Sequence, residues 1–310
     1  MFSTRKMWLI FLLYLFPYAN TAQDIIFGQN KFTEYQIGNM SLIITVPHGG
    51  SKQPSTIPSR DCGCWDMSSS KCFFTHNCPP GTIKDSINCK VSTVKDLYTL
   101  ETALNLGKEI QKITGGYHPH IIINHLSRSK LDVNREKDEA TFGVPEAEQA
   151  WDEFMQFINT AKSYSPKGLL IDVHGHAHPE NWIELGYLIS KQNLDSGAFT
   201  AADSSILFLS KESYNIPFET LLRGDRSLGN NIQEQNKKYL CVPSPTHPGP
   251  SGGNYFKGGY IVKTHGSKDN GQVDAVQIEL PRWIRDSSER PIFCAALAKA
   301  ISNFYNFHFK

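Results

Sequence analysis

The sequence has almost no net charge. It contains 31 lysine and arginine residues against 30 aspartate and glutamate residues, which gives a formal charge of +1 at pH 7. A chain this balanced has no electrostatic bias toward nucleic acid or toward an anionic membrane surface. We therefore expect neither nucleic acid nor a membrane among its partners.

Long apolar runs are also missing after the first residues. The run Trp8–Phe16 follows two basic residues and precedes the small residues of 19–22. This arrangement is typical of a secretory signal peptide, and the run is too short to span a bilayer. We expect cleavage after Ala22 and a secreted, soluble mature chain, residues 23–310. An uncleaved membrane anchor is the alternative.

The chain shows no internal repeat and no linker-like boundary, so we expect one domain over residues 23–310. Short apolar runs alternate with helical patterns, which predicts an α/β fold with a mixed, largely parallel central sheet flanked by helices. The segment 24–39 is expected to be irregular or an edge. The expected strands are 40–46, 120–124, 169–173, 185–190, 204–210, 260–262 and 275–280, and the expected helices are 92–113, a helix opened by Pro145, and 290–307.

Five of the seven cysteines lie in the segment 61–90, which is rich in serine, proline and glycine. In a secreted chain this pattern favours a disulfide-stapled insert, with a zinc ribbon as the alternative. An odd number of cysteines leaves at least one thiol free or paired between chains. The tripeptide Asn39-Met40-Ser41 is a glycosylation sequon that requires an exposed asparagine.

Two predicted core strands run directly into histidines. SLIITVPHGG places His48 after one strand, and GLLIDVHGHAH places His174, His176 and His178 after another. Open α/β sheets bind ligands at the carboxyl ends of their strands, so these imidazoles can meet there. Two converging histidines suit a zinc ion, which in catalytic sites takes three protein ligands. The alternative is that they are loop histidines without a function.

A third ligand must come from elsewhere, because Ser51 stands three residues after His48. Asp96 is the leading candidate, in the first turn of the helix expected at 92–113, with Glu101 in reserve. An acid there equally fits a helix capping box, in which it only satisfies backbone amides.

Two further sets of residues suggest substrate chemistry. The loop Ser127–Glu136 carries Arg128, Asn134 and Arg135, and the planar arginine fork matches a carboxylate, although a surface ion-pair loop is the alternative. Glu279, near the end of the last expected strand, lies on the face opposite Ile278. A buried carboxylate there should have a raised pKa, which suits a general base, whereas a salt bridge to Arg282 or Arg285 is the structural alternative.

Four motifs together resemble the N-formylglutamate amidohydrolase family, a branch of the zinc carboxypeptidase-like fold. They are VPHGG at 46–50, SRSKLDVNRE at 127–136, LIDVHGH at 170–176 and QIELP at 277–281, and their order matches over about Leu42–Phe304. The cysteine-rich insert, expected near the mouth of the site, and the signal peptide depart from the family pattern.

The resemblance implies hydrolysis of an amide C–N bond with one Zn²⁺ per chain, although manganese or iron would tolerate the same ligands. It implies that His48, His174 and Asp96 hold the metal, and that Asn134 and Arg135 grip a substrate carboxylate. Glu279 would take a proton from water and later pass it to the leaving amine. Arg128 and His176 complete our candidates for substrate contact.

The expected substrate is a small N-acyl amino acid or a peptide end that carries a carboxylate. The competing hypothesis is a secreted glycoprotein that kept the fold but lost catalysis and serves in binding or as a matrix component. A disulfide-linked interaction module centred on Cys62–Cys89 is compatible with either.

Overall fold

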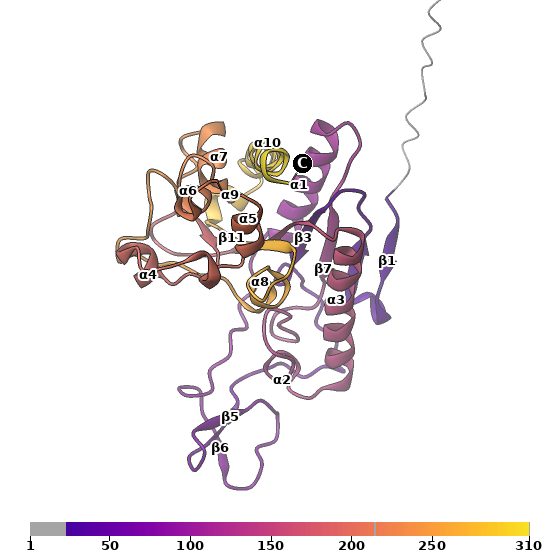
Figure 1. Ribbon diagram of the computed structural model, residues 1–310. Helices are drawn as coiled ribbons and strands as arrows, with labels where there is room; N and C mark the ends of the chain where they lie inside the picture. Colours follow the sequence, from indigo (N-terminus) through magenta and orange to yellow (C-terminus); the bar gives the residue numbers. More distant parts are fainter. Residues whose placement is uncertain (1–22, 214, 310) are drawn as a thin grey trace, which may run out of the picture.

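The computed structural model describes residues 23–213 and 215–309, and its centre is an eight-stranded mixed sheet (Figure 1). The predicted signal peptide lies outside the described residues. The strand order is β1-β2-β7-β3-β8-β11-β9-β10, and the central strands β7, β3, β8 and β11 are parallel. The strands are β1 Ile25–Phe27, β2 Thr33–Gln36, β3 Leu42–Val46, β7 His120–Asn124, β8 Gly168–Gly175, β9 Ile183–Gly186, β10 Cys241–Val242 and β11 Val273–Leu280.

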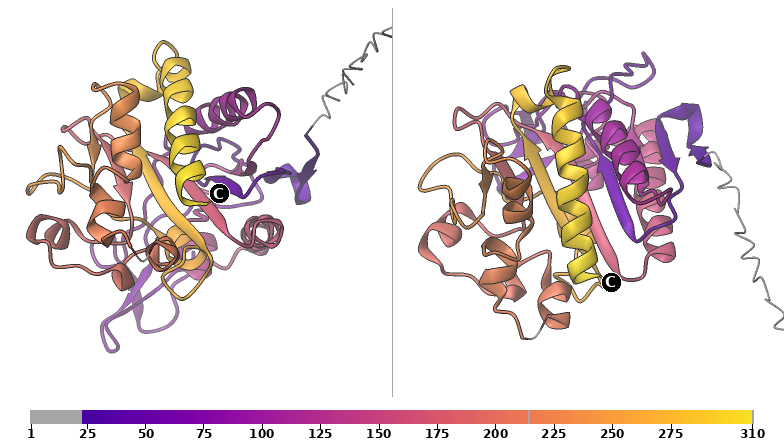
Figure 2. Two further views of the ribbon diagram at one scale, coloured as in Figure 1. Left: turned by 45° about the horizontal axis from the view of Figure 1, so that its top comes forward. Right: turned by 90° about the horizontal axis from the view of Figure 1, so that it is seen from above.

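Helices cover both faces of this sheet. On one face α1 and α10 lie side by side (Figure 2) and pack with α7 over a large apolar cluster, while α3 and α8 cover the other face. This arrangement confirms the expected α/β fold with a mixed sheet. The helices are α1 Thr99–Ile113, α2 Lys137–Thr141, α3 Pro145–Tyr164, α4 Lys191–Ser196, α5 Leu207–Glu212, α6 Phe218–Arg223, α7 Leu228–Gln235, α8 Tyr260–His265, α9 Arg282–Arg285 and α10 Arg290–His308, with short 3₁₀ helices at Gln29–Lys31 and Ala201–Asp203.

The connections between the parallel strands define where a ligand site belongs. Helix α1 links β3 to β7, whereas α3 links β7 to β8, and β7 and β8 lie on opposite sides of β3. The two connections therefore run in opposite directions over opposite faces of the sheet. Open α/β sheets form their binding crevice at the carboxyl ends of the strands where the order reverses in this way. Here those strands are β3 and β8.

The central strands are buried on both sides, which explains their near-continuous apolar sequences. The strand predicted at 120–124 is confirmed with those bounds, and the strands predicted at 40–46, 169–173 and 275–280 are confirmed within a few residues. The segment 24–39 supplies two antiparallel strands, β1 at the edge of the sheet and β2 between β1 and β7.

Several expected elements are wrong. The helix predicted from 92 begins only at Thr99, because Tyr98 takes a left-handed conformation (φ 68°) and the Asp96 amide donates to the carbonyl of His48. The strands predicted at 204–210 and 260–262 are instead replaced by the helices α5 and α8, and the strand predicted at 185–190 is the shorter β9. Short apolar runs do not separate strand from helix by periodicity alone.

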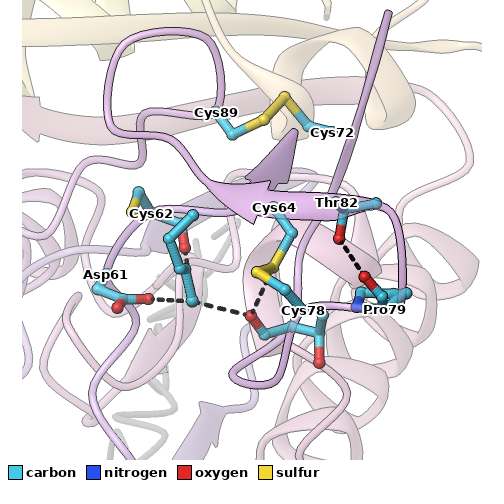
Figure 3. Close-up of a disulfide and its surroundings, with 10 residues drawn as sticks. Asp61, Cys62, Cys64, Cys72, Cys78, Pro79, Thr82 and Cys89 are labelled. Carbon is cyan, nitrogen blue, oxygen red and sulfur yellow. Dashed lines mark hydrogen bonds and ion pairs between the residues drawn. A yellow bond between two sulfur atoms is a disulfide. The ribbon is translucent and has the colours of Figure 1, made fainter. Parts of the chain in front are cut away.

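The cysteine-rich segment projects from the sheet as a small unit of its own (Figure 1). It contains a three-stranded sheet of β4 Cys64–Asp66, β5 Lys71–Phe73 and β6 Thr82–Lys84, which the sequence analysis did not predict. Two disulfides, Cys64–Cys78 and Cys72–Cys89, cross it (Figure 3). The disulfide-stapled insert is confirmed. The zinc-ribbon alternative is excluded, because four of the five cysteines form two disulfides and so provide no thiolates for a metal.

Cys62, Cys241 and Cys294 are outside these disulfides, and the last two are buried. Asn39 of the glycosylation sequon is exposed in the loop between β2 and β3. Among the described residues, no helix combines the length and the apolar character needed to cross a bilayer.

Candidate functional site

Polar side chains collect at the carboxyl halves of the central strands, on the sheet face covered by α3 and α8. Side chains alternate between the two faces of a strand. Ile43, Leu170 and Ala275, each two residues before one of these polar side chains, belong to the apolar cluster under α3 and α8, so the polar side chains lie on that face too. Strand register then sets their neighbours: Asp172 pairs with Thr45 and Gln277, and His174 pairs with Glu279.

Two histidines at this edge, His48 and His174, form a buried cluster with Asp96, which lies in the loop before α1. His48 Nδ1 lies 3.4 Å from Asp96 Oδ2, and His174 Nδ1 lies 3.1 Å from the same oxygen. The two imidazole rings are 4.8 Å apart between centroids, and all three side chains are almost completely buried. The ligand atoms of the cluster lie within 4.8 Å of one another, close enough to bind one metal ion.

Backbone contacts bring Asp96 to the histidines. The amide of Asp96 donates to the carbonyl of His48 (3.2 Å), and the amide of Gly175 donates to the Asp96 carboxylate (3.2 Å). Asp96 therefore precedes the helix and does not cap it. The loop after His48 needs its glycine, because a Cβ on Gly50 would lie 2.3 Å from the carbonyl carbon of His125.

Each imidazole has a buried carboxylate at Nε2, the ring nitrogen that does not face Asp96. His48 Nε2 lies 2.6 Å from Asp132 Oδ1, and His174 Nε2 lies 2.9 Å from Asp172 Oδ2. Arg128 Nε donates to the other oxygen of Asp132 (2.9 Å). A carboxylate on Nε2 fixes the tautomer that leaves Nδ1 free, which is the usual support of metal-binding histidines.

The charges of this cluster oppose the effect of burial. Burial alone would raise the pKa of Asp96, but the neighbouring His48 and His174 outweigh it and hold that pKa below its ordinary value. Burial likewise disfavours the charged form of His174, but Asp172, Asp96 and Glu279 raise its pKa well above its ordinary value. The carboxylates around His174 thus favour a positive charge at this position.

Glu279 lies beside this cluster. Its Oε1 is 3.9 Å from His174 Nδ1 and accepts a hydrogen bond from Gln277 (2.9 Å). Its Oε2 is buried without a hydrogen-bond partner among the described residues. Burial raises the pKa of Glu279 to about 8, although His174 and Arg128 oppose the increase.

The structural alternative for Glu279 does not occur within the described chain. Arg285 donates to the backbone carbonyls of Leu280, Leu97 and His176, and Arg282 pairs with Asp286. Neither guanidinium forms an ion pair with Glu279 among the residues described.

A cavity of about 460 Å³ opens over the cluster. All candidate site residues of the sequence analysis except the reserve ligand line it: His48, Asp96, Arg128, Asn134, Arg135, His174, His176 and Glu279. The reserve ligand Glu101 is exposed on α1 and does not line the cavity. No residue of the segment 61–90 lines it either, so the insert does not form part of the cavity wall.

Some of these residues are already engaged with the protein. The Asn134 amide donates toward Gln277 and accepts from the backbone of Ile261. His176 donates from Nε2 to the carbonyl of Trp182 and accepts at Nδ1 from the amide of His178. Both side chains therefore shape the cavity wall and have little left to offer a substrate.

Arg135 is different, since its side chain is 35% exposed and reaches the cavity. Its Nε donates to Glu139 and its Nη1 donates to the carbonyl of Asn134. Arg128 is largely buried between Asp132 and Asp96. Arg135 is thus the better placed of the two arginines to meet a ligand.

The sequence analysis missed three acidic groups of the site, Asp132, Asp172 and Glu184, and it named His178 without giving it a role. Asp172 carried a local signal, since it stands two residues before His174 on the same strand face. Asp132 lay within the charged loop without a distinct signal. His178 and Glu184 form a close pair at the cavity, with His178 Nδ1 2.7 Å from Glu184 Oε1.

No protein-family model and no curated protein matches the sequence. Solved structures with a similar arrangement include a gene product of Agrobacterium tumefaciens (10% identity, 88% of this chain and 94% of that chain, TM-score 0.43). They also include an N-formylglutamate amidohydrolase from Ralstonia eutropha (10% identity, 92% and 97%, TM-score 0.43) and an N-acetylmuramyl-L-alanine amidase from Mycobacterium abscessus (13% identity, 86% and 99%, TM-score 0.37). At such low identity, the activity of this chain has to be argued from its own site.

Proposed function

We propose that this chain is a secreted, metal-dependent hydrolase that cleaves the amide C–N bond of a small N-acyl amino acid or a peptide end. The observation that carries the proposal is the buried His48–Asp96–His174 cluster, in which both imidazoles present Nδ1 to the same carboxylate. The two disulfides support an oxidising compartment outside the cytosol, and the predicted signal peptide agrees with it.

The residues present fit a divalent metal ion. Two imidazole nitrogens and one carboxylate oxygen are the number and type of ligands found at catalytic zinc sites. Asp132 and Asp172 supply the outer hydrogen bonds that such histidines have. The partnerless Oε2 of Glu279 adds a buried acceptor next to the cluster. We propose Zn²⁺, one per chain, while manganese or iron would accept the same ligands.

When bound, a divalent ion at this cluster would polarise the substrate carbonyl and make a water molecule more acidic. Glu279 Oε2, which has no hydrogen-bond partner in the described part of the chain, takes the proton of the attacking water. Gln277 holds the other oxygen of Glu279 and so fixes the direction of the carboxyl group. A carboxylate with a raised pKa is suited to accept a proton near neutral pH.

The cavity supports a small substrate with an acidic group. Its volume falls within the range of small-molecule sites, and two basic residues, Arg135 and Lys257, are among those that line it. The planar guanidinium of Arg135 can hold a substrate carboxylate, which would orient the acyl group toward Glu279.

Metal content and amide hydrolysis together test this proposal. Elemental analysis should find about one zinc per chain in the wild type, and His174→Ala should lose it. Glu279→Gln should keep the metal but lower kcat on a panel of N-acyl amino acids by about 10²–10⁴-fold, because it removes the proton acceptor. A wild-type protein without metal after zinc reconstitution would contradict the hydrolase and favour a binding protein.

A further inference from the structure

The cavity carries a second group of titratable side chains, apart from the cluster that contains Asp96. Ligand atoms of His176, His178 and Glu184 lie within 4.8 Å of one another. Both ring nitrogens of His176 are already hydrogen-bonded to the backbone, at Trp182 O (2.8 Å) and at the His178 amide (3.0 Å). A metal ion here would have to displace one of these bonds. The geometry therefore favours proton chemistry between the other two residues.

Glu184 holds His178 in a fixed orientation. The fully buried Glu184 places Oε1 2.7 Å from His178 Nδ1, and its Oε2 accepts the amide hydrogen of Phe256 (2.7 Å). The Phe256 ring packs against the imidazole, with centroids 4.6 Å apart. His178 lines the cavity with a side chain that is 21% exposed, and Nε2 is the ring nitrogen that remains for a ligand. A carboxylate that orients an imidazole in a cleft is a recurrent acid–base arrangement.

The proposed hydrolysis requires two proton transfers, one from the attacking water and one to the leaving nitrogen. Gln277 occupies Glu279 Oε1, so Oε2 alone can receive the water proton beside the cluster. The leaving nitrogen also needs a proton, because the C–N bond breaks with its electron pair on nitrogen. His178 offers a separate donor in the same cavity.

Resting on the proposed function, we propose that His178, oriented by Glu184, is the general acid that protonates the leaving amine. The water oxygen forms its bond to the acyl carbon while Glu279 takes one water proton. The C–N bond then breaks, its electron pair goes to nitrogen, and the proton on His178 Nε2 moves to that nitrogen. Solvent returns the proton from Glu279 to His178, which restores both groups. This division of roles differs from a single glutamate that serves as base and then as acid.

The test compares substrates whose leaving groups differ in their need for a proton. We would measure His178→Gln and Glu184→Gln on an N-acetyl amino acid and on p-nitrophenyl acetate, whose leaving phenolate departs without protonation. The expected loss of kcat is about 10²-fold or more on the amide, and much smaller on the ester. Metal content should remain that of the wild type in both variants.

His125→Gln is the matched control. His125 also pairs with a glutamate, Glu34, at 2.7 Å and is also 21% exposed, but it does not line the cavity. It should leave both activities unchanged.

Three outcomes would overturn the proposal for His178: equal losses on amide and ester, no loss on the amide, or loss of a second metal ion per chain in His178→Gln. Failure of the proposed function is separate from these. In that case the wild type would bind metal but hydrolyse neither substrate. There would then be no reaction in which His178 could act as an acid.

Discussion

Replacing Asp172 by asparagine should weaken metal binding while it leaves the fold in place. The Asp172 side chain is fully buried and accepts two hydrogen bonds, from Thr45 Oγ1 (2.7 Å) and from His174 Nε2 (2.9 Å). Asparagine has the same shape, and it can direct its oxygen to His174 and its amide to the Thr45 hydroxyl, which also accepts. The substitution thus removes the negative charge behind His174 and little else.

The magnitude follows from what such carboxylates contribute. Loss of an outer hydrogen-bonding partner of a metal-binding histidine lowers metal affinity by about 10–100-fold, or ~1.4–2.8 kcal/mol. Competition with a chromophoric chelator at neutral pH would measure the zinc affinity, and circular dichroism would verify the fold.

Asp274→Asn is the matched control for this experiment. Asp274 is also a fully buried carboxylate on a central strand, β11, but it accepts its hydrogen bond from Ser267 and lies outside the metal cluster. Its substitution should leave zinc affinity unchanged. The reasoning is refuted if Asp172→Asn binds zinc as tightly as the wild type, or if the two variants lose affinity equally.

Three more predictions follow from the structure. Burial raises the pKa of Asp274 from 3.8 to about 7, so the folded state keeps a proton that the unfolded chain loses in this range. Between these pH values the unfolding free energy of the wild type should fall by on the order of 4 kcal/mol relative to Asp274→Asn in urea titrations, and parallel pH profiles would contradict this. Arg135→Met should raise KM for a carboxylate-bearing substrate by about 10–100-fold, with a smaller change in kcat, because a charge-assisted hydrogen bond is lost; an unchanged KM in steady-state assays would count against it. The double variant Cys64→Ser/Cys78→Ser should destabilise the insert by about 3 kcal/mol and expose 61–90 to limited proteolysis, yet leave zinc affinity unchanged; weaker zinc binding would show that the insert supports the site.

Local sequence patterns were sufficient for much of the framework. Apolar runs identified the central strands, and a proline at the first helical position marked the start of α3. Strict alternation on β11 placed Glu279 on the face opposite Ile278, where it faces the cluster. These features depend on neighbours within a few residues, which is why they can be read without the fold. The histidines at the ends of β3 and β8 were expected to meet because parallel strands share one carboxyl edge.

Short elements and partners distant in sequence could not be obtained in this way. The apolar residues within 204–210 and 260–262 are as few as those of a short strand or a helix turn, and only packing made these segments part of helices. Asp96 lies outside the helix that was predicted to contain it. Its amide donates to the carbonyl of His48, 48 residues away, and its carboxylate accepts from the amide of Gly175, 79 residues away.

The sequence by itself determined which strands carry histidine and glutamate at their ends, because strand periodicity is a local property. Tertiary structure alone decided what surrounds them. Asp132 reaches His48 across 84 residues, and Glu184, on β9, reaches His178 in the loop between β8 and β9. Strand order and loop geometry bring these carboxylates behind the imidazoles, and neither property is encoded in the spacing of residues along a single segment.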